Sequence, residues 1–317
     1  MAEKKIIAVM GATGAQGNGL VKAILNDPDG GFAVRAITRD VNSEKAKELA
    51  ELGAEVVAAD LDNAESVQQA FGGAYGAFCV TFFWNHFSPD KEIEHVQIMA
   101  EAAKRAGLQH VIWSTLEDTR KWIPLSDDRM PTLLDQYKVP HFDAKGSADR
   151  FFVNAGVPTT FLLASFYWDN MIHFGMGPKR GEDGALAITF PMGNKKLVGI
   201  GAEDIGKCAY GILKAGPAEY AGKFVGIAGD HLTGEELAAE LTKAFNEEVR
   251  YNAVSPEVYR SFGFPGADDL GNMFQYYQEF DQVFCASRDL EVSRTLNPSL
   301  QRFEDWLTQN KQLIPID

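Results

Sequence analysis

The chain has 317 residues, of which 45% are hydrophobic and 23% charged, as is typical of a soluble globular protein with a large core. Against 30 basic residues stand 44 acidic ones, so the net charge is −14. No local run of Lys or Arg offsets this charge, which repels a phosphate backbone. We therefore expect no direct binding to nucleic acid.

The cysteines and the apolar runs indicate a cellular compartment. Cys79, Cys208 and Cys285 lie far apart and form no C-x-x-C pair, which argues against a disulfide framework and against a metal site. The apolar run Ile6–Met10 is too short for a signal peptide, and no stretch approaches the roughly 18 to 20 apolar residues that span a bilayer. We expect a cytoplasmic protein with no membrane association.

In the first half of the chain, short apolar runs alternate with amphipathic stretches, a pattern typical of βαβ units. It predicts an α/β fold: a Rossmann-type, doubly wound parallel sheet over residues 1–164. After residue 164 the alternation loosens, which predicts a smaller C-terminal α/β lobe over 165–317 that contacts a substrate or partner and returns some strands to the main sheet. The predicted strands are Ile6–Met10, Ala33–Thr38, Glu55–Ala58, Gly76–Thr81, His110–Ser114 and Thr159–Leu163. The predicted helices are Gly17–Leu25, Ser43–Leu52, Ala64–Phe71, Lys91–Ala106 and Phe142–Asn154.

Three later helices are predicted from their first residues. Thr233 and Glu236 have the spacing of a capping box, and Ser255 precedes a proline suited to a first helical turn. Asn297-Pro298 predicts the start of a last helix that carries Trp306.

A glycine loop follows the first predicted strand and opens a helix. Its first glycine permits a tight turn, its second lets the backbone approach a pyrophosphate, and its third lets the helix pack on the sheet. The free N–H groups of the helix N-terminus attract the anion. The loop therefore predicts a dinucleotide site, and its G-x-x-G-x-x-G spacing resembles the short-chain dehydrogenase/reductase superfamily. Its residues are Gly11, Ala12, Thr13, Gly14, Ala15, Gln16 and Gly17.

The tip of the second strand predicts the choice of cofactor. NAD-selective sites place an acid there, whereas this chain has Thr38 followed by Arg39. A guanidinium can hold the 2′-phosphate of NADP(H) and stack on the adenine, and Ser43 can add a donor. The neighbouring Asp40 leaves room for weaker NAD(H) binding. The alternative is an Arg39 that is merely solvated.

Two further strand ends belong to the predicted cofactor site. Asp60 and Leu61 end the third strand, where such folds contact the adenine. Thr81, Phe82 and Phe83 end the fourth strand, near the nicotinamide half.

The predicted helix after the fifth strand holds the candidate acid–base residues. Related reductases use Tyr-x-x-x-Lys there, whereas this chain has His141 and Lys145. Imidazole is a competent acid–base near neutral pH, so His141 can replace the phenol. Alternatively, Lys145 serves only as a cofactor ligand and His141 packs at the helix start. Tyr137 is a poor substitute, because Pro140 separates it from the helix.

Together these residues resemble the NmrA-like family, atypical short-chain dehydrogenase relatives, and within it the NADPH-sensor type. The resemblance extends over nearly the whole chain. It implies a Rossmann protein that binds NADP(H), often without robust turnover, and reports redox state to protein partners; a homodimer also fits. The motifs that carry the resemblance are Gly11–Gly17, Thr38-Arg39, Thr81–Trp84, His141–Gly146 and, as the most family-specific, Gly263–Ala267 with Asp269-Leu270 and Asn272–Phe274.

The resemblance also implies further contacts on the nicotinamide side. In the family the segment after the sixth strand reaches the cofactor, which assigns Tyr167 and Asn170 to the site. Sensor-type members can carry a cofactor-binding Lys in the helix after the fourth strand. Near that register this chain has Glu94 and His95, with Lys91 one turn earlier, so contact from this helix is in doubt.

Three functions remain open at the level of sequence. The missing Tyr and the resemblance favour a redox sensor that acts through protein partners. The alternative is an NADPH-dependent oxidoreductase of quinones or activated carbonyls that uses Lys145 and His141, because a quinone needs little proton assistance from the protein. The third is a scaffold that works without cofactor.

Overall fold

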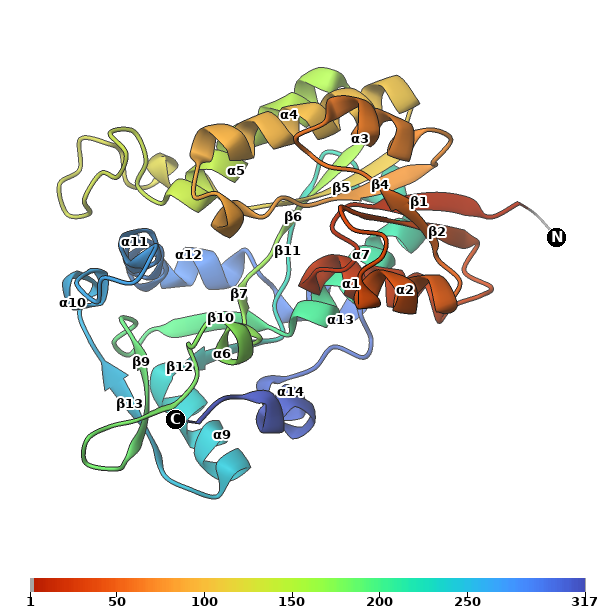
Figure 1. Cartoon of the computed structure of the whole chain (residues 1–317). Coiled ribbons are helices and arrows are strands. Elements are labelled where there is room, and N and C mark those ends of the chain that lie inside the picture. Colours follow the sequence, from red (N-terminus) through yellow and green to blue (C-terminus); the bar gives the residue numbers. More distant parts are fainter. Residues whose placement is uncertain (1–2, 317) are drawn as a thin grey trace.

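The computed structural model describes residues 3–316. Figure 1 shows a lobe in which helices cover both faces of a large sheet, joined to a second lobe of small sheets and short helices. Among the described residues, no helix combines the length and the apolar character needed to cross a membrane.

The large sheet has seven parallel strands in the order β11-β6-β5-β4-β1-β2-β3. The chain winds outward from β1 in both directions, because β1 pairs with β2 on one side and with β4 on the other. In such sheets ligands bind outside the carboxyl ends of the strands at this switch point. The strands are β1 (Lys5–Val9), β2 (Phe32–Thr38), β3 (Glu55–Ala58), β4 (Gly76–Cys79), β5 (His110–Thr115), β6 (Thr159–Leu163) and β11 (Phe224–Gly226).

Two helical layers enclose this sheet. Side chains of α1, α2 and α7 share one apolar core with the strands, and side chains of α3, α4 and α5 share the other, as the two sides of the sheet in Figure 1 show. The contact between α1 and α7 depends on glycine: a Cβ on Gly206 would lie 2.1 Å from the backbone nitrogen of Leu20. The helices are α1 (Ala15–Leu25), α2 (Glu44–Glu51), α3 (Ala64–Phe71), α4 (Pro89–Ala106), α5 (Pro140–Ala155) and α7 (Ala202–Ala215).

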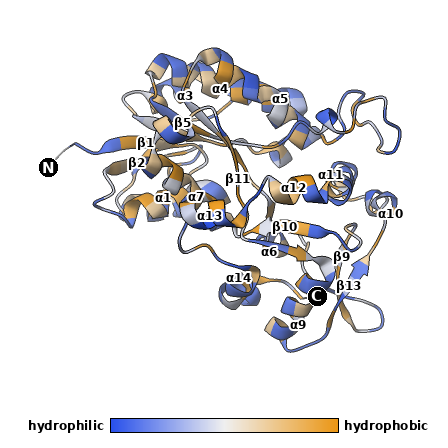
Figure 2. Ribbon diagram, turned by 180° about the vertical axis from the view of Figure 1, so that it is seen from behind, coloured by the Kyte–Doolittle hydropathy of each residue, from blue (hydrophilic) through white to orange (hydrophobic). Residues whose placement is uncertain are grey.

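The second lobe has a separate apolar core, which includes Trp168, Phe274 and Trp306. It contains two three-stranded sheets, β12-β10-β7 and β13-β9-β8. Figure 2 shows that helices in both lobes carry hydrophobic and hydrophilic residues side by side, as expected for amphipathic helices. The strands are β7 (Phe166–Tyr167), β8 (Lys179–Arg180), β9 (Leu186–Phe190), β10 (Lys196–Ile200), β12 (Asp230–Thr233) and β13 (Val249–Ala253). The remaining helices are α6 (Asn170–His173), α8 (Pro217–Tyr220), α9 (Gly234–Phe245), α10 (Pro256–Arg260), α11 (Ala267–Glu279), α12 (Asp281–Ala286), α13 (Leu290–Leu296) and α14 (Phe303–Asn310).

The predicted Rossmann-type sheet and its six strands are confirmed, as are the capping box at Thr233 and the cap at Ser255. The predicted last helix is wrong at its start, because α14 begins at Phe303. Asn297 instead donates to Asp204 and accepts from Ser299, which holds this segment as a loop. The segment after 164 contributes to both lobes, since β11 pairs with β6 in the main sheet.

Candidate functional site

The glycine loop joins β1 to α1 at the switch point of the sheet. Gly11 has φ +63°, and a Cβ on Gly17 would lie only 2.4 Å from the carbonyl oxygen of Gly11, so both positions require glycine. No side chain caps α1, in contrast to α2, which Ser43 caps. The first-turn N–H groups of α1 are therefore left for another acceptor, and the exposed Gly14 lets one approach.

The adenosine end contains Arg39, which directly follows β2. Arg39 is exposed, and no ion pair or hydrogen bond of its side chain is found within residues 3–316. Asp40 faces its own loop, where its carboxylate accepts the backbone N–H of Asn42 at 2.8 Å. Ser43 has a structural role, because its hydroxyl accepts from Ala46 and donates to the carbonyl of Asp40.

Asp60 and Leu61 follow β3, one strand further out. The Asp60 carboxylate accepts from the backbone of Asp62 at 3.0 Å, and its own backbone N–H donates to Ser66. Asp60 is exposed and Leu61 half-buried. Both remain open to a ligand at the strand ends.

A buried polar network lies at the end of β4. Thr81 donates a hydrogen bond to Glu92 of α4 and accepts one from Lys145 of α5. The Lys145 ammonium lies 2.7 Å from Glu92 Oε1 and 5.0 Å from the centre of the Trp113 ring. Burial alone would raise the pKa of Glu92, but the charge of Lys145 and the hydrogen bonds lower it to about 2. Lys145 therefore faces a buried, ionised carboxylate.

His141 lies one turn before Lys145, at the start of α5. Its Nδ1 is 2.7 Å from Oδ1 of Asp269 in α11, and its backbone N–H donates to Oδ2 of the same carboxylate at 3.2 Å. Both side chains are buried. Tyr137 lies outside α5, which begins at Pro140, as the sequence predicts.

Aromatic side chains surround His141. The Trp84 ring centre is 4.8 Å from that of His141, and the buried Phe83 ring is 5.9 Å away. Phe87, whose ring packs against Phe83 and Trp84, is 45% exposed, so part of this cluster reaches the surface. The adjacent residue Phe82 is 54% exposed. An apolar, partly open surface therefore adjoins the His141 and Lys145 end.

Tyr167 and Asn170 follow β6, and Tyr167 contacts the glycine loop. Gln16 donates to the Tyr167 hydroxyl, which joins the loop to β7. Burial raises the pKa of Tyr167 to about 12, so the phenol stays protonated at neutral pH. Gln16 Oε1 is buried and has no partner within residues 3–316. Asn170 begins α6 and is half-buried.

Sequence reasoning missed two site residues, Glu92 and Asp269. The sequence contained a signal for Asp269, because it lies in the most family-specific stretch, but nothing in the spacing paired it with His141. Glu92 lies in α4, close to the positions where sensor-type relatives can carry a cofactor-binding Lys. There Lys91 and His95 instead bind the surface residue Asp62, each at 2.8 Å.

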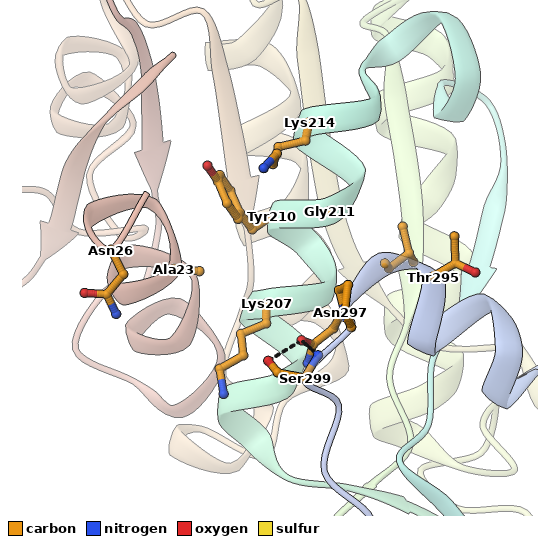
Figure 3. A pocket seen from close by; sticks show the side chains of 11 residues that line it. Ala23, Asn26, Lys207, Tyr210, Gly211, Lys214, Thr295, Asn297 and Ser299 are labelled. Carbon is orange, nitrogen blue, oxygen red and sulfur yellow. Dashed lines mark hydrogen bonds between the residues drawn. The ribbon is translucent and has the colours of Figure 1, made fainter. Parts of the chain in front are cut away.

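A separate hollow of about 470 Å³ lies between α1, α7 and the segment 295–299 (Figure 3). None of the predicted site residues lines it. Its two lysines already have acidic partners: Lys207 lies 3.1 Å from Asp204, and Lys214 lies 2.9 Å from Asp27. This hollow therefore offers no free charge to a ligand.

The residues present fit a dinucleotide. An uncapped helix N-terminus, with glycines where a Cβ would fill the loop, suits a pyrophosphate. The free Arg39 suits a phosphate on the adenosine ribose. Gln16 Oε1, which has no partner within residues 3–316, offers an acceptor beside the glycine loop. These groups all lie at the carboxyl ends of the parallel strands.

Comparisons with known proteins agree with this geometry. A model of the NmrA-like family matches residues 3–307. The NmrA-like family domain-containing oxidoreductase FrzB from Cladobotryum sp is 28% identical over 298 residues, covering 86% of this chain and 84% of that protein. Its counterpart ptmS from Penicillium ochrochloron is 27% identical, covering 96% and 98%.

A solved structure of NmrA, described as a negative transcriptional regulator in complex with NADP, has a TM-score of 0.77. It is 25% identical to this chain, covering 96% of this chain and 94% of that one. A second NmrA structure, at 25% identity and a TM-score of 0.78, contains NAD and covers the same shares. Because the family model spans almost the whole sequence, this chain belongs to the NmrA-like family.

Proposed function

We propose that this protein is an NADP(H)-dependent reductase of quinones or activated carbonyl compounds. The observation that carries the proposal is the pair His141 and Lys145, which lie one turn apart on the buried part of α5. Lys145 also donates a hydrogen bond to Thr81. A Tyr and a Lys with this spacing act in the related reductases, and imidazole can exchange a proton near neutral pH. The oxidoreductase names of FrzB and ptmS add support.

NADP(H) is the proposed cofactor, with NAD(H) bound more weakly. The uncapped start of α1 would hold the pyrophosphate, and Arg39 would hold the 2′-phosphate that NAD(H) lacks. Asp40 accepts from its own loop, so it opposes this phosphate less than a free carboxylate would. The NmrA structures with NADP and NAD support binding of both.

A bound dihydronicotinamide supplies the hydride. Lys145, held by Thr81 and Glu92, would donate hydrogen bonds to the adjoining ribose hydroxyls. The exposed rings of Phe82 and Phe87 offer apolar contact to a flat acceptor. An acceptor such as a quinone needs little help from a protein acid, so a tyrosine is dispensable.

Calorimetric titration with NADPH, NADP⁺ and NADH, followed by a turnover screen on the same sample, tests the proposal. We expect tighter binding of NADPH than of NADH, and steady NADPH oxidation with at least one member of a panel of quinones and α-diketones. The double variant Lys145→Met, Glu92→Gln removes the charge pair together and should abolish turnover. If the wild type oxidises NADPH with no member of the panel, the proposal is overturned.

Redox-dependent regulation through protein partners is a second candidate. It is favoured by the missing tyrosine and by the likeness to NmrA, a negative transcriptional regulator, at a TM-score of 0.77 over 96% of the chain. Saturating NADPH should then change the protease sensitivity of the chain or its self-association into a homodimer. If neither changes, this function fails. A reducing compartment such as the cytoplasm suits both functions, because the three cysteines are free thiols.

A further inference from the structure

Asp269 connects the second lobe to the acid–base end of the candidate site. Its carboxylate meets His141 twice, with Oδ1 at 2.7 Å from Nδ1 and Oδ2 at 3.2 Å from the backbone nitrogen. The two residues are separated by 128 positions in the chain. Each side chain is less than a tenth exposed, so water competes little for these contacts.

These contacts determine which ring nitrogen of His141 carries a proton. A carboxylate oxygen only accepts hydrogen bonds, so Nδ1 must donate to Asp269. Within residues 3–316, Nε2 takes part in no hydrogen bond, so it is left for another partner. The ring is also held in orientation by Trp84, 4.8 Å away, and by Phe142 at the same distance.

The start of α11 is anchored on the segment that leads into α5. The fully buried Asn272 donates to the carbonyl of Pro131 at 2.9 Å and to that of Lys138 at 2.6 Å. In the turn before α11, a Cβ on Gly266 would lie 2.8 Å from the Trp84 ring. The most family-specific stretch of the sequence therefore packs directly against the surroundings of His141.

We propose that Asp269 is a positioning residue that makes His141 the proton donor of the site; this rests on the proposed reductase function. The substrate carbonyl carbon accepts the hydride of the dihydronicotinamide, while its oxygen accepts the proton from Nε2 of His141. The dihydronicotinamide would thereby be oxidised, and His141 would be left neutral with its remaining proton on Nδ1. Asp269 offsets the positive charge of the doubly protonated ring, and solvent restores the Nε2 proton.

The variant Asp269→Asn should reverse this arrangement without a change of shape. The backbone N–H of His141 requires an acceptor, so the amide oxygen of the new side chain takes the place of Oδ2. Its NH₂ group then faces Nδ1, which must accept instead of donate. The neutral ring now carries its proton on Nε2, and the charge that stabilised the doubly protonated ring is gone.

The protonation of the ring can be measured by nitrogen NMR on histidine-labelled protein, with His141 assigned by its loss in His141→Gln. In the wild type we expect a protonated Nδ1 on His141, and in Asp269→Asn a bare Nδ1 with the proton on Nε2. The neighbouring Asp268→Asn is the control, because Asp268 is exposed on the same helix and loses the same charge. Its spectrum should match the wild type.

Steady-state kinetics test the role of Asp269 in a second way, because a purely structural role would not lower kcat while leaving NADPH binding unchanged. In Asp269→Asn we expect kcat to fall roughly 100-fold, at the low end of what a positioned proton donor contributes, with the calorimetric Kd for NADPH unchanged. A wild-type His141 with a bare Nδ1, or an unchanged ring in Asp269→Asn, would overturn the proposal. If the wild type reduces no acceptor, the reductase function fails, and the NMR result alone decides whether Asp269 orients His141.

Discussion

The phosphate cradle and the acid–base end of the candidate site lie at neighbouring strand ends, but they are built from different groups. The cradle consists of backbone: glycines Gly11 and Gly17 allow close approach, and the first N–H groups of α1 face outward without a cap. The acid–base end consists of side chains, in which Glu92 of α4 and Asp269 of α11 each hold one basic residue of α5.

The difference determines how each end tolerates change. A backbone site depends on the local conformation of one loop, so a single added side chain can block it while the rest of the fold is unaffected. A site of buried charge pairs depends on segments far apart in the chain, and removal of one partner leaves the other buried and unpaired. Changes at the cradle should therefore affect binding, and changes at the acid–base end should affect stability as well.

The largest expected effect follows from removal of the charge that faces Glu92. Lys145→Met leaves a fully buried carboxylate without its cation, which should lower the free energy of unfolding by about 3 to 5 kcal/mol. Adding Glu92→Gln should recover most of the loss, because the remaining pair is neutral. Urea denaturation measures both variants. A double variant no more stable than the single one would show that the pair contributes little to folding.

At the cradle we expect a loss of binding without a loss of stability. Gly14→Asp places a negative charge at the uncapped start of α1 and should weaken NADPH binding at least about 100-fold, near 2.7 kcal/mol. Gly14 has φ −87°, which other residues adopt, and an added Cβ would lie 3.2 Å from the Gly11 oxygen. Gly14→Ala, which adds a Cβ without a charge, should therefore fold normally and lose less NADPH affinity in calorimetry than Gly14→Asp. Equal losses of NADPH affinity in the two variants would mean that the space at Gly14, and not the added charge, determines binding at the cradle.

Asp149 lies on α5 one turn after Lys145, and it should make the free energy of unfolding depend on pH. Burial raises its pKa to about 7, against hydrogen bonds from Thr115 and Trp113 that lower it. Asp149 thus keeps its proton up to a higher pH in the folded state than in the unfolded state. Its contribution to the free energy of unfolding is therefore complete below about pH 4 and is lost as the pH rises towards 7.

Asp149→Asn keeps the acceptor oxygen and removes the charge. We expect the variant to match the wild type near pH 4 and to exceed its unfolding free energy increasingly as the pH rises, by about 1 to 3 kcal/mol at pH 8. Thermal unfolding across this range measures the difference. A gap between the two proteins that does not grow with pH would contradict the raised pKa.

The smallest expected effect concerns the adenosine end. Arg39→Ala should weaken NADPH binding about tenfold, near 1.4 kcal/mol, as for one hydrogen-bonded charge, and should weaken NADH binding much less. Lys104→Ala, an exposed change in the last turn of α4, is the control for net charge. A parallel loss of NADPH and NADH affinity would remove Arg39 from the 2′-phosphate site.

Local sequence was sufficient to predict the Rossmann-type sheet and the glycine loop between β1 and α1, because both depend on short-range signals. Apolar runs, glycine spacing and helix caps act over a few residues, and the strands, the loop at Gly11–Gly17 and the cap at Thr233 follow from them. The start of α14 could not be predicted in this way, because Asp204, far away in the chain, binds Asn297.

The partners of the acid–base residues were decided only by the tertiary structure. The sequence identified His141 and Lys145 by their spacing of four, which one helix turn explains. It could not identify Asp269, because the contact joins residues 128 positions apart. Nor could it identify Glu92, whose burial beside Lys145 depends on how α4 and α5 pack on the same face of the sheet. Charge pairs of this kind leave no periodic pattern, since they arise where separate elements meet.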